Sequence, residues 1–419
     1  MIQREIAVIG AGVAGLASAI LLSRQGHRVT LYERFDRPQP LGSGLMIQPT
    51  GLAALQRLGL RHGLEALGHR IERLHGLTAR GTTVFDLAYA DLRPAWHAIA
   101  VHRAALHGVL WDGFVRSGAA LETGCDVTSV DERAGGRAAP VDARGRHLPA
   151  ADLVIDASGA RSALRQIVTA RQPMPFVYGA VWATVPDRSL SPGALSQRYV
   201  SARIMIGYLP LGRLSADAPD CAALFWSLKP QTYGLWRAGF QSWREYAAGL
   251  WPEIAPVLAE LEGPDAFALA RYAHFTAPRL SRGPLVLVGD AAHVTSPQLG
   301  QGANQGLIDA VVLSDALAAC GEIAEALRLY EKRRRRHVRF YQHASALMTP
   351  FFQSDSGLLG GIRDLSFRHF KRVPYLSREM LRTLAGLKTG LFTAAAPEEI
   401  VNCVPAAPES LHIPVAREQ

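Results

Sequence analysis

The stretch EIAVIGAGVAGLASAILLSRQGHRVTLYER, from Glu5 to Arg34, decides the fold of this chain. It begins with the unbroken apolar run Ile6–Ile9, which is typical of a buried parallel strand. The glycine pattern GxGxxG follows at once, and the next apolar segment predicts a helix over residues 13–25 that Gly26 ends. A second strand then runs to Glu33. The stretch therefore predicts a strand–turn–helix–strand unit that binds a dinucleotide.

Each glycine of the pattern has a physical task. Gly10 allows the tight turn, Gly12 lets the backbone approach a pyrophosphate, and Gly15 lets the helix pack closely on the sheet. The helix N-terminus offers free N–H groups and a positive dipole end to the same phosphates. Glu33 follows about 20 residues later, where a carboxylate accepts hydrogen bonds from the ribose hydroxyls. FAD and NAD both use this unit, so the pattern leaves the choice between them open.

A second glycine-rich stretch, LVLVGDAAHVTSPQLGQGANQGLIDA, runs from Leu285 to Ala310. Its apolar strand ends at Gly289, and Asp290 follows at the carboxyl edge of the sheet, where ligands of open α/β sheets bind. Pro297 interrupts the next loop, and we expect a helix from about Gly302. We call residues 285–310 the late motif, and they predict a second ligand contact at this edge.

A third stretch, AADLVIDASGARSALRQ, covers residues 150–166. The apolar run "LVI" predicts another strand, which leads into the turn Asp156-Ala157-Ser158-Gly159. We expect a helix to begin with Arg161 and Ser162 and to continue through Arg165. We call residues 156–165 the middle motif.

The three motifs, in this order, resemble the class A FAD-dependent monooxygenases, the para-hydroxybenzoate hydroxylase-like family, over about residues 5–345. The resemblance implies an α/β fold: a Rossmann-type FAD-binding domain with an inserted antiparallel-sheet substrate domain and C-terminal helices. It also implies FAD as cofactor and NAD(P)H as a transient co-substrate. In that family a flavin C4a-hydroperoxide, formed with O2, hydroxylates the substrate. For this chain we expect an aromatic or polyketide-like small molecule.

The resemblance places the ADP end of FAD on the first glycine turn and the flavin end on the late motif. It makes His293 a buried, hydrogen-bonded turn residue rather than a base, and it puts Arg103 on a helix beside the FAD. We assign no catalytic residue. The expected cofactor-binding residues are Gly10, Gly12, Ala14, Gly15, Glu33, Arg34, Arg103, Asp290, Pro297, Gly300, Gly302, Ala303 and Asn304.

The middle motif departs from the family pattern at one position. Hydroxylases of this family usually have Asp-Gly where this chain has Ser158-Gly159. The lost charge leaves the nicotinamide-binding role of this turn open. The same Asp-Ala-Ser-Gly turn also occurs in the related geranylgeranyl reductases. A flavin-dependent reductase or other non-oxygenating oxidoreductase is therefore an alternative, and a flavoprotein that binds a partner without catalysis is a third hypothesis.

The substrate is expected under a strand-rich segment. Residues 171–275 contain three runs that predict successive antiparallel strands, and residues 76–97 are expected to add strands to the same sheet. Because side chains alternate along a strand, half of the candidates there face away from the flavin. The candidate substrate contacts are Tyr178, Trp182, Arg198, Tyr208 and Gln298, and the same strands contain Tyr199 and Met205.

These segments divide the chain. The FAD-binding domain is expected in three parts, residues 1–75, 98–170 and 276–345, with the substrate sheet at 76–97 and 171–275. Residues 346–394 predict C-terminal helices. Residues 395–419, rich in Ala, Pro and Glu, are expected to be a loose tail.

The composition excludes several classes of protein. The net charge of +9 comes from scattered arginines, which suits an anionic cofactor but does not indicate nucleic acid. The basic run Lys332–Arg336 predicts a solvated helix face. Four isolated cysteines support neither a metal site nor disulfides, so we expect a cytoplasmic protein. No apolar run reaches the length of a transmembrane helix. A homodimer is a further possibility.

Overall fold

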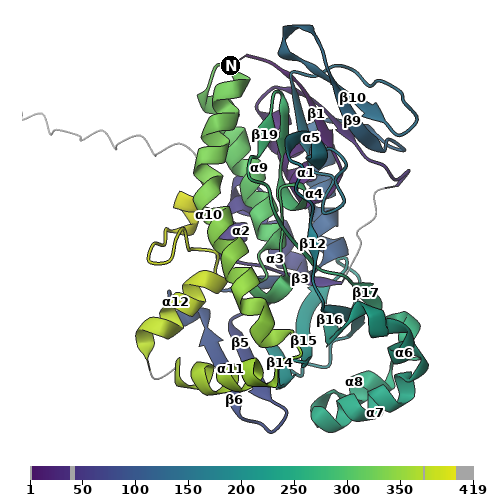
Figure 1. Ribbon diagram of the computed structural model, residues 1–419, viewed down its shortest axis with the longest axis vertical. Coiled ribbons are helices and arrows are strands. Elements are labelled where there is room, and N and C mark those ends of the chain that lie inside the picture. The colour runs from purple at the N-terminus through teal and green to yellow at the C-terminus, as the bar shows by residue number, and fades with distance from the viewer. Residues whose placement is uncertain (1, 38–42, 371–372, 403–419) are drawn as a thin grey trace, which may run out of the picture.

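A parallel sheet forms the centre of the upper half of the molecule (Figure 1). The computed structural model describes residues 2–37, 43–370 and 373–402. The sheet has the order β19-β20-β11-β1-β2-β8, and its neighbours are parallel except for β19 and β20. Its strands are β1 (Glu5–Ile9), β2 (Arg28–Tyr32), β8 (Ala120–Glu122), β11 (Leu153–Asp156), β19 (Ser281–Arg282) and β20 (Leu285–Leu287). The Rossmann-type order expected from the first glycine turn is confirmed.

Long helices pack against this sheet and against one another. Helix α1 (Val13–Arg24) joins β1 to β2 and packs on α4 (Arg103–Ser117) and α9 (Gly302–Ala319). Helix α10 (Ile323–Phe352) runs along α9 and extends toward the lower half of the molecule (Figure 1). The main apolar core lies between these helices and the sheet. Most of α1 is buried because it is covered on several sides, which explains its nearly uniform apolar sequence.

The lower half contains a seven-stranded sheet with the order β17-β13-β16-β15-β14-β5-β6. Strand β5 runs parallel to β14, and every other neighbouring pair is antiparallel. Residues 76–97 contribute to this sheet as expected, through β5 and β6. The strands are β5 (Arg73–Thr78), β6 (Thr83–Ala88), β13 (Gly179–Pro186), β14 (Ala194–Val200), β15 (Ile204–Arg213), β16 (Asp220–Leu228) and β17 (Ala268–Ala270).

The two faces of the seven-stranded sheet are covered by different elements. On one face, Val181, Tyr208 and Trp226 pack with Trp243 under the helices α6 (Tyr233–Ala238), α7 (Phe240–Leu250) and α8 (Ala255–Ala259). We call this the outer face. The sequence analysis did not predict these helices, because it expected residues 171–275 to be rich in strands.

The opposite face, which we call the inner face, is apolar and turns toward the FAD-binding half. It carries Tyr199, Met205, Leu209 and Phe225. A Cβ at Gly44 would lie 2.5 Å from a methyl of Leu211, so the chain from the upper half packs directly on this face. Gly44 begins β3 (Gly44–Ile47), which forms a small sheet with β7 (Ala98–His102) and β4 (His69–Ile71).

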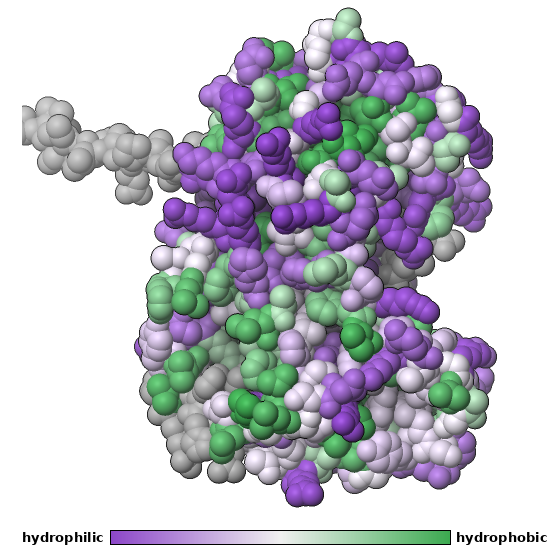
Figure 2. All heavy atoms as spheres, in the orientation of Figure 1, coloured by the Kyte–Doolittle hydropathy of each residue, from purple (hydrophilic) through white to green (hydrophobic). Residues whose placement is uncertain are grey.

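The C-terminal segment is helical, as expected, and it closes the lower half. Helices α11 (Gly357–Phe370) and α12 (Pro374–Leu384) follow α10, with Pro374 at the start of α12. Figure 2 shows apolar residues gathered over this part of the surface, where Leu358 and Leu365 of α11 are exposed. In the described part of the chain, no helix is long and apolar enough to cross a membrane.

The expectation of a loose tail from residue 395 is wrong for its first residues. Helix α13 (Pro397–Val401) packs on α2 (Pro49–Arg57), and Val401 is buried in the main core. Its proline begins the helix and its apolar residues face the core, so the Ala/Pro/Glu composition was a poor guide here. The rest of the expected tail, residues 403–419, lies outside the described residues.

Candidate functional site

The first glycine turn is tight everywhere except at one position. Gly10 has φ of 101° and donates its N–H to the Tyr32 carbonyl at 2.7 Å. A Cβ at Gly15 would lie 1.9 Å from the Gly10 carbonyl oxygen, so any side chain there would force α1 off the turn. A Cβ at Gly12 would meet nothing within 4 Å. The open side of the turn is therefore at Gly12, beside the N-terminus of α1, where a diphosphate can approach the backbone.

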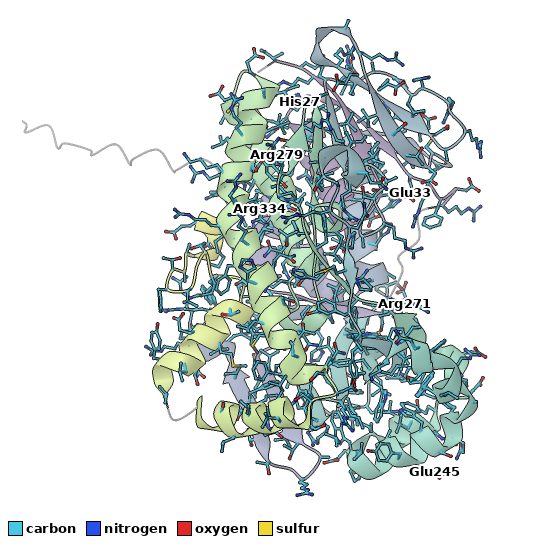
Figure 3. The ribbon with its side chains drawn as sticks, in the orientation of Figure 1. His27, Glu33, Glu245, Arg271, Arg279 and Arg334 are labelled. Atoms are coloured by element: carbon cyan, nitrogen blue, oxygen red, sulfur yellow. The ribbon has the colours of Figure 1, made fainter. Side chains whose placement is uncertain are left out.

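Glu33 holds the far side of the same turn. Its carboxylate is buried and accepts hydrogen bonds from the N–H of Ala11 at 2.7 Å and of Phe35 at 3.1 Å. Two backbone donors fix the carboxylate at the end of β2, where Figure 3 labels it. Arg34 is exposed and lies over the ring of Phe35. Ala14 faces the late motif, because a Cβ at Gly289 would lie 3.0 Å from the Ala14 methyl.

The late motif is fixed by a buried carboxylate that the sequence reading did not single out. Asp309 of α9 accepts the Gly289 N–H at 2.7 Å, His293 Nε2 at 2.6 Å and Arg334 Nε at 2.6 Å. All three side chains, Asp309, His293 and Arg334, are at most 1 % exposed. The expectation that His293 is a buried, hydrogen-bonded residue is therefore confirmed. Gly289 has φ of 57°, which favours glycine at this corner.

Arg334 corrects the expectation that Lys332–Arg336 is a solvated helix face. Its four basic neighbours are exposed, but Arg334 points inward from α10 (Figure 3) and is paired with Asp309. It also donates to Gln305 Oε1 at 2.6 Å and lies 2.9 Å from His337 Nδ1. A run of five basic residues on a helix necessarily covers all sides of that helix, so one member reaches the core.

The surroundings of this network lower the pKa values of Asp309 and His337. Burial alone would raise the pKa of Asp309, but the charges of His293 and Arg334 outweigh it and hold that pKa well below its usual range. For His337, burial and the nearby Arg334 charge lower the pKa to about 3. The network therefore contains an ionised aspartate, a charged arginine and a neutral His337.

Asp290 lies at the carboxyl edge of the sheet, directly after the strand that ends in the late motif. Its side chain is exposed in the structure. The protein atoms around its carboxylate raise its pKa, while the charges of His293, Arg103 and Arg165 oppose that shift. Arg103 begins α4 and its N–H donates to the Ser43 carbonyl at 2.9 Å. The charge of Arg103 therefore acts on the Asp290 carboxylate at this edge.

The start of α9 is bound firmly to β3 and α2. Asn304 is fully buried, accepts the Gln48 N–H at 2.8 Å, and donates to the carbonyls of Met46 at 3.1 Å and Gly300 at 2.8 Å. Gly300 has φ of 61°, which lets the chain turn from the short 3-10 helix at Pro297–Leu299 into α9. Asn304 is thus a structural residue that holds the helix N-terminus in place.

Open space and unpaired polar atoms lie at this helix start. A Cβ at Gly302 would meet nothing within 4 Å, and Pro297 is exposed while Ala303 is partly buried. The buried atoms Gln48 Nε2 and Gln301 Oε1 have no hydrogen-bond partner among the residues that the structure describes. Buried polar atoms without partners are rare in proteins, and a ligand with donors and acceptors along one edge would satisfy them.

The middle motif lies between the first glycine turn and the late motif. Asp156 is fully buried and accepts hydrogen bonds from the Ser158 N–H at 3.0 Å, Ser158 Oγ at 2.6 Å and Ser162 Oγ. Arg165, also buried, donates to the carbonyls of Gly159, Ala160, Asp290 and Ala291. The helix expected to begin at Arg161 begins only at Arg165, as α5 (Arg165–Val168), because this hydrogen bonding shapes a non-helical turn first.

These features fit FAD. The open Gly12 position and the carboxylate of Glu33 suit the diphosphate and ribose of an ADP moiety. The helix N-terminus at Gly302 and the unpaired Gln48 and Gln301 atoms suit the polar edge of an isoalloxazine. The two groups lie at the carboxyl edge of one sheet, so one extended cofactor can reach both.

Comparison with known proteins agrees with the geometry. The family of the FAD-binding domain matches residues 3–344. The chain belongs to this family. It is 30% identical over 342 residues to the FAD-dependent urate hydroxylase of Klebsiella pneumoniae subsp. pneumoniae, covering 79% of this chain and 86% of the relative. It is 31% identical over 360 residues to the 3-amino-4-hydroxybenzoate 2-monooxygenase of Streptomyces cremeus, covering 80% and 84%.

A solved structure shows the same fold. The crystal structure of Klebsiella pneumoniae HpxO complexed with FAD and uric acid has a TM-score of 0.78, with 93% of this chain and 98% of that chain covered at 23% identity. The protein is therefore a flavoprotein with the fold of the class A FAD-dependent monooxygenases, as the three motifs indicated, and FAD is its cofactor.

In this flavoprotein, the expected substrate contacts divide between the two faces of the seven-stranded sheet. Trp182 lies on the inner face, with its ring tilted against that of Phe225 at 4.4 Å between ring centres, and Tyr199 and Met205 are buried on the same face. Tyr178, next to β13, is also buried and donates its hydroxyl to Asp355 at 2.9 Å. The inner face turns toward the FAD-binding half, so these residues lie on the side of the sheet where substrate is expected. Tyr178 and Tyr199 are, however, covered by other parts of the protein.

Two candidates lie on the wrong face. Tyr208 is fully buried on the outer face and donates to Asp187 at 2.6 Å. Arg198 lies over the ring of Trp251 at 4.6 Å and 3.9 Å from Glu253, and Trp251 packs with the outer helices. The strand alternation that the sequence left open puts both of them away from the flavin, so neither is a substrate contact.

Gln298 joins the late motif to the sheet. Its Nε2 donates to Gln353 Oε1 at 2.9 Å, and Gln353 Nε2 donates to the Gly179 carbonyl at 3.1 Å. This chain of contacts runs from the turn at Pro297 through the end of α10 to the start of β13. It fixes the distance between the flavin end of the site and the inner face.

The sequence analysis did not identify one residue that contacts Trp182. The Tyr272 hydroxyl accepts a hydrogen bond from Trp182 Nε1 at 2.9 Å, and its side chain is half-buried. Burial raises the pKa of Tyr272 to about 12, while Trp182 and the charge of Arg103 lower it. The charge of Arg103 therefore acts to lower the pKa values of both Tyr272 and Asp290. In the sequence, Tyr272 is a tyrosine shortly before the late motif, and it belongs to no recognisable motif.

Proposed function

We propose that this flavoprotein hydroxylates an aromatic or polyketide-like small molecule with NAD(P)H and O2. One observation carries the proposal: an apolar sheet face is held over the turn at Pro297 by the bridge Gln298–Gln353–Gly179. FAD, when bound, supplies the electron transfer from NAD(P)H to O2. The names of the Klebsiella and Streptomyces relatives, a urate hydroxylase and an aminohydroxybenzoate monooxygenase, support the same chemistry.

The roles of this chain's residues follow from their contacts. Gly12 and Glu33 would bind the ADP end, while Asp290 and the start of α9 would bind the flavin end. The apolar inner face would hold the substrate ring flat and keep water out, which limits wasteful reaction of reduced flavin. No described side chain is required as a general base, and the protein's share is positioning and exclusion of water.

The reductase alternative loses its support. It rested on Ser158, and Ser158 has a local explanation: its hydroxyl and N–H both hold the buried Asp156. An aspartate at position 158 would put a second carboxylate against Asp156. The serine is therefore accounted for by its neighbour and does not favour different chemistry.

Ligand-stimulated turnover tests the proposal. The purified holoprotein would be screened with aromatic acids and polycyclic phenols while NAD(P)H oxidation and O2 uptake are recorded together. The expected result is stimulation by at least one ligand, with equimolar loss of NAD(P)H and O2 and a hydroxylated product. Anaerobic turnover of NAD(P)H to a saturated product would contradict the proposal and support a reductase. NADH and NADPH would be compared in the same assay.

The assembly and location of the protein stay predictions. We propose a homodimer that acts on small molecules in the cytoplasm. The exposed apolar residues of the C-terminal helices, such as Leu358 and Leu365, support a contact between copies. Light scattering of the holoprotein would give its mass directly.

A further inference from the structure

The inner face offers an aromatic ligand almost no charge. The seven strands of the sheet carry three arginines and no lysine. Arg73 and Arg213 are half exposed and paired with Asp86 and Asp220. The third, Arg198, lies on the outer face. The strands of the sheet therefore present no free cation on the inner face.

One arginine reaches the inner face from another element, and its charge is balanced. Arg363 of α11 is fully buried, with its guanidinium 4.4 Å from the centre of the Tyr199 ring. It donates to Asp364 at 2.6 Å and to the Phe351 carbonyl at 3.1 Å. Its donors are thus used within the C-terminal helices. On the FAD-binding side, the charge of Arg103 opposes the rise in the Asp290 pKa. Arg271 is exposed to solvent at the right side of the waist between the two halves (Figure 3).

Acidic residues line the hollow beside Trp182. A first hollow is lined by Ser43, Trp182, Thr184 and Asp265. It continues into a second, which shares Thr184 and Asp265 and is also lined by Glu260 and Glu262. Arg188 and Arg237 pair with Glu260 and Asp265. Glu262 leaves a net negative charge beside these two hollows, which disfavours an anion there.

The polar groups that remain near Trp182 are neutral. The Tyr272 oxygen accepts the indole N–H, so its own proton is free to be donated. The raised pKa keeps that proton in place at neutral pH. A phenol can donate one hydrogen bond to a hydroxyl or carbonyl oxygen, but it cannot balance the full charge of a buried carboxylate.

We propose that the hollow beside Trp182 takes an uncharged aromatic ring, anchored through one oxygen by the Tyr272 hydroxyl. This inference rests on the proposed function and narrows its substrate class. It separates this flavoprotein from the Streptomyces relative, whose named substrate is a benzoate. A ring with a carboxylate would have to bury that charge opposite apolar side chains and close to the acidic residues of the neighbouring hollow.

Two probes that differ by one carboxylate test the substrate class. The FAD-loaded protein would be titrated with 1-naphthol and with 1-hydroxy-2-naphthoate, and the change in flavin absorbance would give each Kd. We expect 1-naphthol to bind at least about tenfold more tightly, since an unpaired buried charge costs more than that factor. Equal or tighter binding of the carboxylate, or no response to 1-naphthol, overturns the proposal.

Variants test the anchor separately. Tyr272→Phe should weaken 1-naphthol about tenfold, the usual worth of one hydrogen bond, and leave the Kd of naphthalene unchanged. Arg198→Gln is the control and should leave the Kd values of 1-naphthol and 1-hydroxy-2-naphthoate unchanged. An unchanged Kd for 1-naphthol in Tyr272→Phe removes the anchor, and a carboxylate affinity that falls in Arg198→Gln contradicts the outer-face assignment.

The binding readout needs neither NAD(P)H nor O2. If 1-naphthol binds as expected but no ligand stimulates NAD(P)H oxidation, the proposed function fails and the ligand class stands. If carboxylated rings bind and are hydroxylated, the ligand class fails and the proposed function stands.

Discussion

At the scale of single residues, Gly12 and Gly15 belong to one turn but have opposite surroundings. A methyl group on Gly15 would collide with the Gly10 carbonyl, whereas one on Gly12 would point into open space. Gly12 has φ of −80° and ψ of −175°, which alanine adopts without strain. Gly12→Ala should therefore fold like the original protein and bind FAD at least about tenfold more weakly, because the methyl group occupies the path of the diphosphate.

Gly15→Ala is the matched comparison and should lose folded protein. Thermal unfolding of the FAD-free variants, followed by circular dichroism, gives stability, and flavin fluorescence during titration gives the FAD Kd. If Gly12→Ala bound FAD like the original protein, the diphosphate would not lie at this turn.

Arg334 and Arg335 form a second residue-scale comparison. They are neighbours in the basic run, but Arg334 is buried against Asp309, while Arg335 is half exposed and paired with Glu331. Arg334→Met should lower the free energy of unfolding by about 3–5 kcal/mol, because Asp309 keeps a buried charge with one partner fewer. Arg335→Met should cost at most about 1 kcal/mol. Urea unfolding of both variants checks this. A loss of stability in Arg334→Met as small as that in Arg335→Met would mean that the buried network contributes little.

At the scale of elements, the turn of the middle motif explains the departure from the family pattern. Burial raises the pKa of Asp156, and the hydrogen bonds from Ser158 and Ser162 partly offset that rise. Ser158→Ala should cost about 1 kcal/mol through the lost hydrogen bond. Ser158→Asp should cost more at pH 8, because two carboxylates then share one buried site.

The pH dependence distinguishes the two variants. A shared site retains a proton to higher pH than a single carboxylate, so the extra cost of Ser158→Asp should shrink as pH falls and one group is protonated. Urea unfolding at several pH values measures it. Equal stability of Ser158→Asp and Ser158→Ala at pH 8 would show that the turn accommodates the usual aspartate.

Elements of the FAD-binding half could be predicted closely because glycines and apolar runs mark them locally. The helix expected at 13–25 is observed at Val13–Arg24, and the one expected from Gly302 begins there. The start of α5 was misplaced, since Ser158 and Ser162 bind Asp156 within a non-helical turn and Arg165 reaches the distant Ala291 carbonyl. The outer helices α6–α8 were missed for a similar reason: their stability comes from packing on the sheet.

At the scale of the whole molecule, one buried histidine connects the late motif to the C-terminal segment. His337 of α10 contacts Arg334 through Nδ1 and the Gly386 carbonyl through Nε2, at 2.8 Å. Its pKa is lowered from 6.5 to about 3 by burial and by Arg334. Between these two pH values the unfolded chain binds a proton that the folded protein does not bind. The free energy of unfolding should therefore fall as pH falls through this window, by about 1.4 kcal/mol per pH unit from this group.

His337→Gln isolates that contribution, because glutamine can still donate to the Gly386 carbonyl and does not titrate. The slope of stability against pH between 6.5 and about 4 should be smaller in the variant. Urea unfolding across this range measures both slopes. Identical slopes would show that His337 is protonated in the folded protein.

The faces of the substrate sheet could not be predicted from sequence, because strand alternation gives two sets of residues without saying which set meets the cofactor. Trp182 and Met205 proved to be inner, and Arg198 and Tyr208 outer. That assignment depends on which elements cover each face, and α6–α8 and β3 come from separate parts of the chain. The contact between Tyr272 and Trp182 could not be predicted for the same reason, because the two residues are 90 positions apart in sequence.

Incorporation of isotopically labelled oxygen tests the central claim most directly. The holoprotein would turn over a stimulating aromatic ligand with NAD(P)H under 18O2, and the product would be analysed by mass spectrometry. The structure and the family predict one labelled oxygen atom per product molecule, with equimolar consumption of NAD(P)H. A product that forms without the label, or that forms equally well without O2, would contradict hydroxylation at this site.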